Sequence, residues 1–164
     1  MGSGKSSAGE LLERLTGLPR RDTDDLVASS FQMPITEVFD RFGEEEFRRR
    51  ETQVVAELPD EPAIIVTGGG VVLRSENVAI LRRLGTIVSL TADEETLFQR
   101  VARRDTRPLL RTDDPRRTLS ELLRARKPLY TAAADFEIDT AALTRDEVAQ
   151  AILDRLGTPN MHVA

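Results

Sequence analysis

The residues best suited to chemistry lie at the start of the chain, which reads Gly2-Ser3-Gly4-Lys5-Ser6. Glycines let a loop fold its backbone N–H groups around phosphate oxygens, and a helix that begins at Ser6 would direct its positive end at the same anion. Lys5 can reach the β- and γ-phosphates, and the Ser6 hydroxyl can bind Mg²⁺. Only two of the 23 basic residues are Lys, so we expect this Lys to be present for its chemistry. The segment predicts a site for a nucleoside triphosphate.

The segment matches only the second half of the Walker A pattern, G-x-x-x-x-G-K-[ST], which follows a strand. The first Gly of the pattern would lie two residues before Met1, and the strand would lie further upstream. A start assigned too late, a truncated chain or an internal Met of a longer chain would each explain this. A flexible glycine-rich start is the alternative interpretation, although such a start usually lacks the amphipathic helix that follows here.

Two further segments carry groups that could act on a phosphate acceptor. In Asp22-Thr23-Asp24 the two carboxylates are two residues apart, and in an extended chain they share a face. One could hold Mg²⁺ through water while the other accepts a proton from a hydroxyl. The alternative is that Asp24 caps the next helix. Residues 68–70 are three glycines after an apolar run, which would let the backbone approach a ligand or form a flexible turn.

Arginines supply the other candidate groups. Residues 44–51 read EEEFRRRE, and the aromatic Phe47 beside Arg48 could support an Arg that points into a cleft and clamps a carboxylate. From Arg100 to Lys127 there are nine Arg and one Lys against four acids. A mobile lid closing over phosphates explains this cluster better than a basic surface or a weak RNA patch, because interleaved aromatic residues are absent from it.

The elements that must position these groups alternate between helices and short apolar strands. We expect strands at 63–67, 86–90 and 136–139, and helices at 6–15, 24–31, 34–42, 44–58, 75–84, 93–104, 116–134 and from Thr144 onward, where Glu147 completes a capping box. This order predicts an α/β three-layer sandwich with a mostly parallel sheet flanked by helices. Ligands of such sheets bind beyond the carboxyl ends of the strands, where most candidate residues lie.

The composition fits one soluble domain. The chain has 164 residues and a net charge of −5, which argues against a general nucleic-acid partner. It has no Cys, which excludes disulfides and is compatible with a cytoplasmic location. Its apolar runs fall short of a membrane span, so we expect no membrane partner. The only His, His162, lies in the polar tail and is not expected to be catalytic.

Taken together, the motifs resemble those of shikimate kinases from Met1 to about Leu156. The resemblance rests on their order: GSGKSS, DTD, GEEEFRRRE, a strand ending in GGG, RPLL and RKPLY. It implies a P-loop kinase fold over residues 1–156, with a mobile lid at about 105–115 and a tail at 157–164. It also implies transfer of phosphate from ATP to the 3-hydroxyl of shikimate, with Mg²⁺, in the route to aromatic amino acids, by what we expect to be a monomer.

The resemblance also assigns roles, residue by residue. It implies that Gly2, Ser3, Gly4, Lys5, Ser6 and Ser7 cradle the ATP phosphates, with Lys5 catalytic and Ser6 on Mg²⁺. Asp22 resembles the acid near the metal, and Asp24 resembles the residue that holds the shikimate hydroxyls and acts as base. The remaining shikimate site would comprise Arg48, Gly69 and Arg126, and Arg107 resembles the catalytic lid arginine that covers ATP, with Arg100 a further candidate.

Two other functions stay open at this point. One is a related small-molecule kinase, of gluconate or of a nucleoside monophosphate. The other is a nucleotide-binding module without catalytic activity, which the incomplete Walker A pattern favours and the retained Lys5, Ser6, Asp22 and Asp24 oppose. The adenine-contacting residue also stays open, since residues 139–143 offer no basic side chain and Arg145 is too displaced to assign.

Overall fold

Within the part of the chain that the structure describes, four strands form two parallel pairs. The computed structural model describes residues 2–102 and 112–157. In it, β1 (Arg20–Asp22) pairs with β2 (Ile64–Val66), and β3 (Val88–Thr91) pairs with β4 (Phe136–Asp139). The predicted parallel strands are confirmed, but the sequence analysis missed β1 because Arg20 and Arg21 make it polar. Both arginines are only partly buried, and they pair with Glu13 and Glu61.

Helices make up most of the rest of the described chain. Gly43 (φ 79°, ψ 172°) breaks α3 internally, at the boundary between the helices expected at 34–42 and 44–58. The capping box between Thr144 and Glu147 is confirmed. The bounds are α1 (Lys5–Thr16), α2 (Thr23–Phe31), α3 (Ile35–Ala56), η1 (Val71–Leu73), α4 (Ser75–Leu84), α5 (Glu94–Ala102), α6 (Pro115–Ala133) and α7 (Arg145–Arg155).

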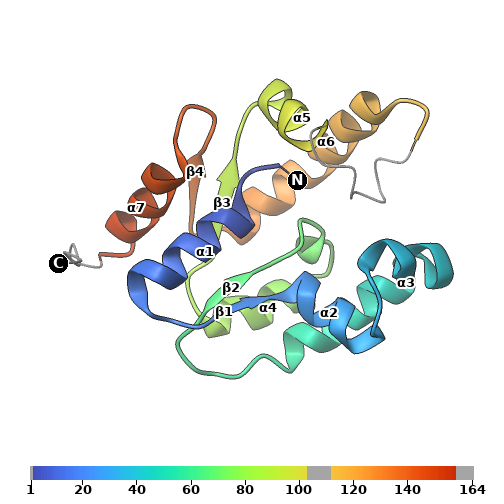
Figure 1. Ribbon diagram of the computed structural model, residues 1–164, viewed down its shortest axis with the longest axis horizontal. Coiled ribbons are helices and arrows are strands. Elements are labelled where there is room, and N and C mark those ends of the chain that lie inside the picture. Colours follow the sequence, from blue (N-terminus) through green and yellow to red (C-terminus); the bar gives the residue numbers. More distant parts are fainter. Residues whose placement is uncertain (1, 103–111, 158–164) are drawn as a thin grey trace.

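The helices lie on both faces of the strands, as the predicted α/β sandwich requires. Figure 1 shows α1 in front of the strands and α4 behind β2, with α7 beside β4 and with α2 and α3 at the opposite side of the molecule. One apolar cluster joins Ala8 of α1 to Ile138 of β4 and Ile152 of α7. A second lies between α2 and α3, and a third joins α3 and α4 with Ile65 of β2.

Close packing of α1 on β2 holds the phosphate-loop segment next to the strand ends. A methyl group added at Gly9 would collide with Val66 of β2, so only glycine allows this approach. Gly17 ends α1 in the left-handed conformation (φ 71°) and donates its N–H to Glu13. Among the described residues, no helix is both long enough and apolar enough to cross a bilayer.

Candidate active site

The segment Gly2–Ser7 forms a loop that opens directly into α1. Gly4 is the N-cap of the helix in a left-handed conformation (φ 89°), and no side chain caps the first turn. Gly2 also has a positive φ, 74°, and a methyl group there would lie 2.9 Å from the carbonyl oxygen of Leu97. The uncapped N–H groups of the first turn and the helix dipole make this end suited to an anion.

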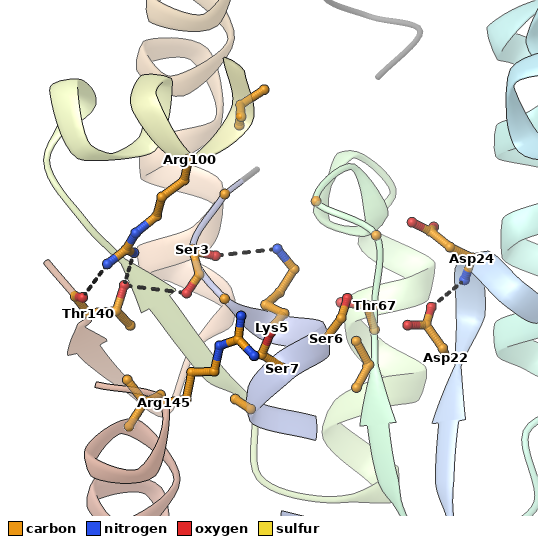
Figure 2. A pocket seen from close by; sticks show the side chains of 18 of the residues that line it. Ser3, Lys5, Ser6, Ser7, Asp22, Asp24, Thr67, Arg100, Thr140 and Arg145 are labelled. Atoms are coloured by element: carbon orange, nitrogen blue, oxygen red, sulfur yellow. Dashed lines mark hydrogen bonds between the residues drawn. The ribbon is translucent and has the colours of Figure 1, made fainter. Parts of the chain in front are cut away.

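The side chains of this loop face a cavity of about 440 Å³. Lys5 Nζ donates to Ser3 Oγ at 3.4 Å, within the loop. Figure 2 shows Lys5 and Ser6 on one side of the cavity and Asp22 and Asp24 across from them. The cavity brings together nine of the predicted site residues: Gly2, Ser3, Gly4, Lys5, Ser6, Ser7, Asp22, Asp24 and Gly69.

Asp22 and Asp24 line the cavity from a strand-to-helix turn, whereas the sequence analysis expected them on one face of an extended segment. β1 ends at Asp22 and α2 begins at Thr23, so Asp22 rather than Asp24 is the N-cap, accepting the N–H of Asp24 at 3.0 Å. Burial, helped by the neighbouring Asp25 charge, raises the pKa of Asp22 above its usual 3.8, although the Arg20 guanidinium at 3.4 Å opposes this. Asp22 and Asp24 therefore line one cavity from the turn between β1 and α2.

Residues 68–70, which we call the glycine turn, follow β2 and lie against both acidic and basic side chains. A methyl group added at Gly68 would lie 2.5 Å from Asp24 Oδ1 and 3.2 Å from Glu51 Oε1, and one at Gly70 would overlap the guanidinium of Arg48. Tyr130 of α6 donates its hydroxyl to the Gly69 carbonyl at 2.5 Å. The close approach of these side chains explains the glycines better than turn flexibility does.

Arg48, Glu51 and Arg126 form a buried charged group beside this turn. Arg48 and Arg126 are 7% and 6% exposed, and Arg48 Nη1 donates to Glu51 Oε2 at 2.8 Å. Burial raises the pKa of Glu51, while the charges of Arg48 and Arg126 partly offset that rise. Oε1 of Glu51 is buried and has no hydrogen-bond partner among the described residues, so it can accept a further hydrogen bond.

Sequence reasoning missed Glu51, because within residues 44–51 it singled out only Phe47 and Arg48. The signal that could have identified it is its spacing: Glu51 is three residues after Arg48, so the two lie on the same face of α3. The predicted support of Arg48 by Phe47 is confirmed, since the Phe47 ring lies under the Arg48 guanidinium at 5.0 Å and is itself buried.

The segment after β4 contributes residues that the sequence analysis left open. Arg100 donates to the hydroxyl and carbonyl oxygens of Thr140 at 2.9 and 2.8 Å, and the Thr140 hydroxyl donates to the Ser3 carbonyl at 3.4 Å. Arg145, which the sequence analysis considered too displaced to assign, lines the cavity. The turn after β4 brings it to the same edge as the other strand ends (Figure 2).

Arg107 and most of the predicted lid fall in residues 103–111, which lie outside the described residues. Of the lid expected at 105–115, residues 112–115 are described, and they lead into α6, whose N-cap is Asp114. The arrangement that is described combines an anion-binding loop, two carboxylates and two buried guanidinium groups. It can place a phosphate chain opposite an acceptor that carries a carboxylate.

Comparisons with known proteins agree with this chemistry. The family model described as shikimate kinase matches residues 1–157. The shikimate kinase of Thermodesulfovibrio yellowstonii is 42% identical over 93% of this chain and 88% of its own length, and that of Pseudomonas syringae pv. tomato is 44% identical over 95% and 91%.

Solved structures agree as well. The structure of shikimate kinase from Acinetobacter baumannii in complex with shikimate superimposes with a TM-score of 0.90 at 34% identity, covering 98% of this chain and 90% of that one. Shikimate kinase from Aquifex aeolicus gives a TM-score of 0.78 at 29% identity, with 96% and 91% coverage. This chain belongs to the shikimate kinase family.

Proposed function

We propose that this chain transfers the γ-phosphate of ATP to the 3-hydroxyl of shikimate, producing shikimate 3-phosphate for aromatic amino acid biosynthesis. The observation that carries the proposal is one cavity joining the phosphate loop to Asp24 and the glycine turn, with buried Arg48 and Arg126 beside that turn. Family membership makes the chain a kinase, and the similar Acinetobacter protein was solved with shikimate bound.

At the nucleotide end, residues 2–7 would cradle the phosphates, and Ser6 and Asp22 would hold Mg²⁺. The fit is good because Mg²⁺ prefers oxygen ligands and usually binds through one or two protein groups plus phosphates and water. Ser6 and Asp22 line the same cavity. Within the described residues there is no group of three or more His, Cys, Asp or Glu side chains that could hold a metal, so phosphate oxygens would complete the coordination. When bound, the ion neutralises charge on the phosphates.

At the acceptor end, the Arg48 and Arg126 guanidinium groups would bind the shikimate carboxylate, and Gly69 would contact the ring. Asp24 would orient the attacking hydroxyl and accept its proton. Glu51 holds Arg48 in place, and this fixes the direction of its fork. With the carboxylate fixed at one end, the hydroxyl at the other end faces the phosphate loop.

The transfer itself would be in-line, without a covalent enzyme intermediate. Lys5 would neutralise charge that develops on the γ-phosphate. Arg107 would act with it, a role that rests on the sequence alone. Burial of Arg48 and Glu51 keeps water away from the acceptor carboxylate, which strengthens each charge interaction there.

The test is ADP release coupled to NADH oxidation, with shikimate, gluconate or a nucleoside monophosphate as acceptor, and with product analysis by ³¹P NMR. We expect turnover with shikimate alone and a phosphate on the 3-hydroxyl. Asp24→Asn should abolish turnover while ATP still binds, and Asp25→Asn, on the exposed side of the same helical turn, is the matched control. Turnover with another acceptor, or ATP binding without turnover by the parent chain, contradicts the proposal.

The expected monomer and cytoplasmic location belong to this proposal. All the groups assigned to the two substrates lie on one chain, so the proposed reaction needs no partner subunit. Analytical ultracentrifugation checks the first expectation, and a sedimenting dimer at micromolar concentration would contradict it. Fractionation of the source cells checks the second.

A further inference from the structure

A side chain of α6 holds the glycine turn from one side. The hydroxyl of Tyr130 donates to the Gly69 carbonyl oxygen at 2.5 Å, and the two residues are 61 positions apart in the chain. Tyr130 ends the RKPLY motif at residues 126–130, which begins with Arg126. Arg126 has a role in the proposed reaction, and the hydrogen bond of Tyr130 suggests that the end of the motif has one as well.

The Gly69 carbonyl differs from its neighbours in where its partner lies. The carbonyls of Gly68 and Gly70 each accept the N–H of the residue three positions later, at 3.2 and 3.0 Å. Among the described residues, the Gly69 carbonyl is the one in the turn whose partner belongs to another element. Glycine has no side chain to restrict rotation of its peptide units. The orientation of the peptide between Gly69 and Gly70 therefore depends on Tyr130.

This peptide carries a donor as well as an acceptor. The described chain has no cis peptide bond, and in a trans peptide the C=O and N–H groups point in opposite directions. While Tyr130 binds the Gly69 carbonyl, the N–H of Gly70 points away from Tyr130. A flip of the peptide would put an acceptor where the turn now presents a donor.

The turn lies among the groups assigned to the phosphate acceptor. Gly70 is so close to the Arg48 guanidinium that a methyl group added there would overlap it. On the other side, Tyr130 follows Arg126 by four residues in α6, so the two side chains share one face of the helix. The helix α6 also packs against η1, which directly follows the turn. One helix face therefore supplies both a carboxylate-binding guanidinium and the hydrogen bond to the turn.

We propose that Tyr130 is a positioning residue for the phosphate acceptor. Its hydroxyl fixes the peptide between Gly69 and Gly70, so that the glycine turn is held in its binding orientation beside Arg126. The inference rests on the proposed function, because it places the acceptor against the turn. Without the hydroxyl, fewer molecules would have the turn in this orientation, which weakens the apparent affinity without changing the complex once it has formed.

The first test is kinetic and uses Tyr130→Phe, which removes the hydroxyl and keeps the ring. We expect KM for shikimate to rise roughly five- to tenfold, the effect of one neutral hydrogen bond, with kcat and the KM for ATP little changed. Thr131→Val is the matched control, because it removes the hydroxyl of the exposed next residue, which donates to Glu137 at 2.9 Å. It should change neither KM value.

The kinetic outcomes separate this inference from the proposed function. An active parent chain whose KM for shikimate is unaffected by Tyr130→Phe overturns the role of Tyr130 alone. An equal rise in both KM values also overturns it, because a general loss of structure would affect both substrates. A parent chain that does not turn over shikimate overturns the proposed function, and this inference with it.

The second test observes the hydrogen bond without substrate. Residues 68–70 are the only consecutive glycines of the chain. Glycine labelled with ¹³C at the carbonyl and with ¹⁵N therefore gives carbonyl-to-amide NMR correlations only from Gly68 to Gly69 and from Gly69 to Gly70. Tyr130→Phe should move the Gly69 carbonyl resonance upfield and leave that of Gly68 nearly unchanged, and Thr131→Val should move neither. An unmoved Gly69 carbonyl overturns the proposal.

A second substitution decides the matter if Tyr130→Phe fails to fold. Tyr130 is the only tyrosine, so biosynthetic incorporation of 3-fluorotyrosine alters this position alone. The fluorinated phenol is a stronger donor, because fluorine withdraws electrons from the ring. It should move the Gly69 carbonyl resonance downfield and keep the KM for shikimate at or below the parent value. An unmoved resonance, or a fivefold rise in this KM, overturns the proposal.

Discussion

Replacing Arg126 with alanine tests the acceptor half of the site most directly. Arg126 is 6% exposed, so its bonds to a bound carboxylate form away from bulk water. Hydrogen bonds to charged groups contribute about 1.5–3 kcal/mol, and this burial favours the upper half of that range. A loss of about 2–3 kcal/mol corresponds to a roughly 30- to 150-fold rise in KM for shikimate. The value of kcat should change much less, because the carboxylate is bound equally in the ground and transition states.

Arg124→Ala is the matched control for this experiment. Arg124 lies two residues earlier on α6 and is exposed, so its loss should leave both KM values unchanged. Arg126→Lys keeps the charge without the planar fork and should give an intermediate KM. The assay is coupled ADP release at saturating ATP, with thermal unfolding to confirm that each variant is folded. A folded Arg126→Ala enzyme with an unchanged KM for shikimate would refute the assignment of the carboxylate site.

The other predictions concern the phosphate loop, the metal carboxylate and the buried charges. Lys5→Met should lower kcat by about 10²- to 10³-fold in the same assay while the chain stays folded, because it removes charge stabilisation of the transferring phosphate. Burial raises the pKa of Asp22, so its contribution to the free energy of unfolding is present at low pH and is lost as pH rises through the raised pKa. Asp22→Asn should flatten that fall above about pH 4 in urea titrations, and an unchanged slope would contradict it. Glu51→Gln should cost about 2 kcal/mol, or roughly 4–8 °C in Tm. This cost is smaller than the cost of breaking a typical buried ion pair, because burial already disfavours the charged form of the Glu51 carboxylate. By scanning fluorimetry Glu46→Gln, at a partly exposed surface pair, should show no such loss.

Elements with strong local signals were predictable from the sequence. The helix at 75–84 and the strand at 136–139 match α4 and β4 residue for residue. The capping box at Thr144 and the break at Gly43 also lie where the sequence placed them. Their signals come from apolar periodicity, caps and turn residues within a few positions of one another, so no distant contact is needed to read them.

Features that depend on distant partners were not predictable. β1 is a strand because it pairs with β2, more than forty positions along the chain, and not because its own residues favour one. Glu51 is buried because the glycine turn after β2 packs over it. Arg145 reaches the cavity because the end of β4 meets the phosphate loop through Thr140 and Ser3. Each depends on segments that only the fold brings together.

The sequence by itself determined the chemistry available to this protein: a Gly-Lys-Ser loop, two carboxylates, a glycine turn and the arginines that resemble those of shikimate kinases. Residue types and short spacings carry that information, because they specify charge, donors and backbone freedom. Only the tertiary structure decided which groups share one cavity, and that Glu51 joins the two arginines. It also decided that Tyr130 holds the glycine turn from α6, because burial and hydrogen bonds of this kind depend on contacts between distant segments.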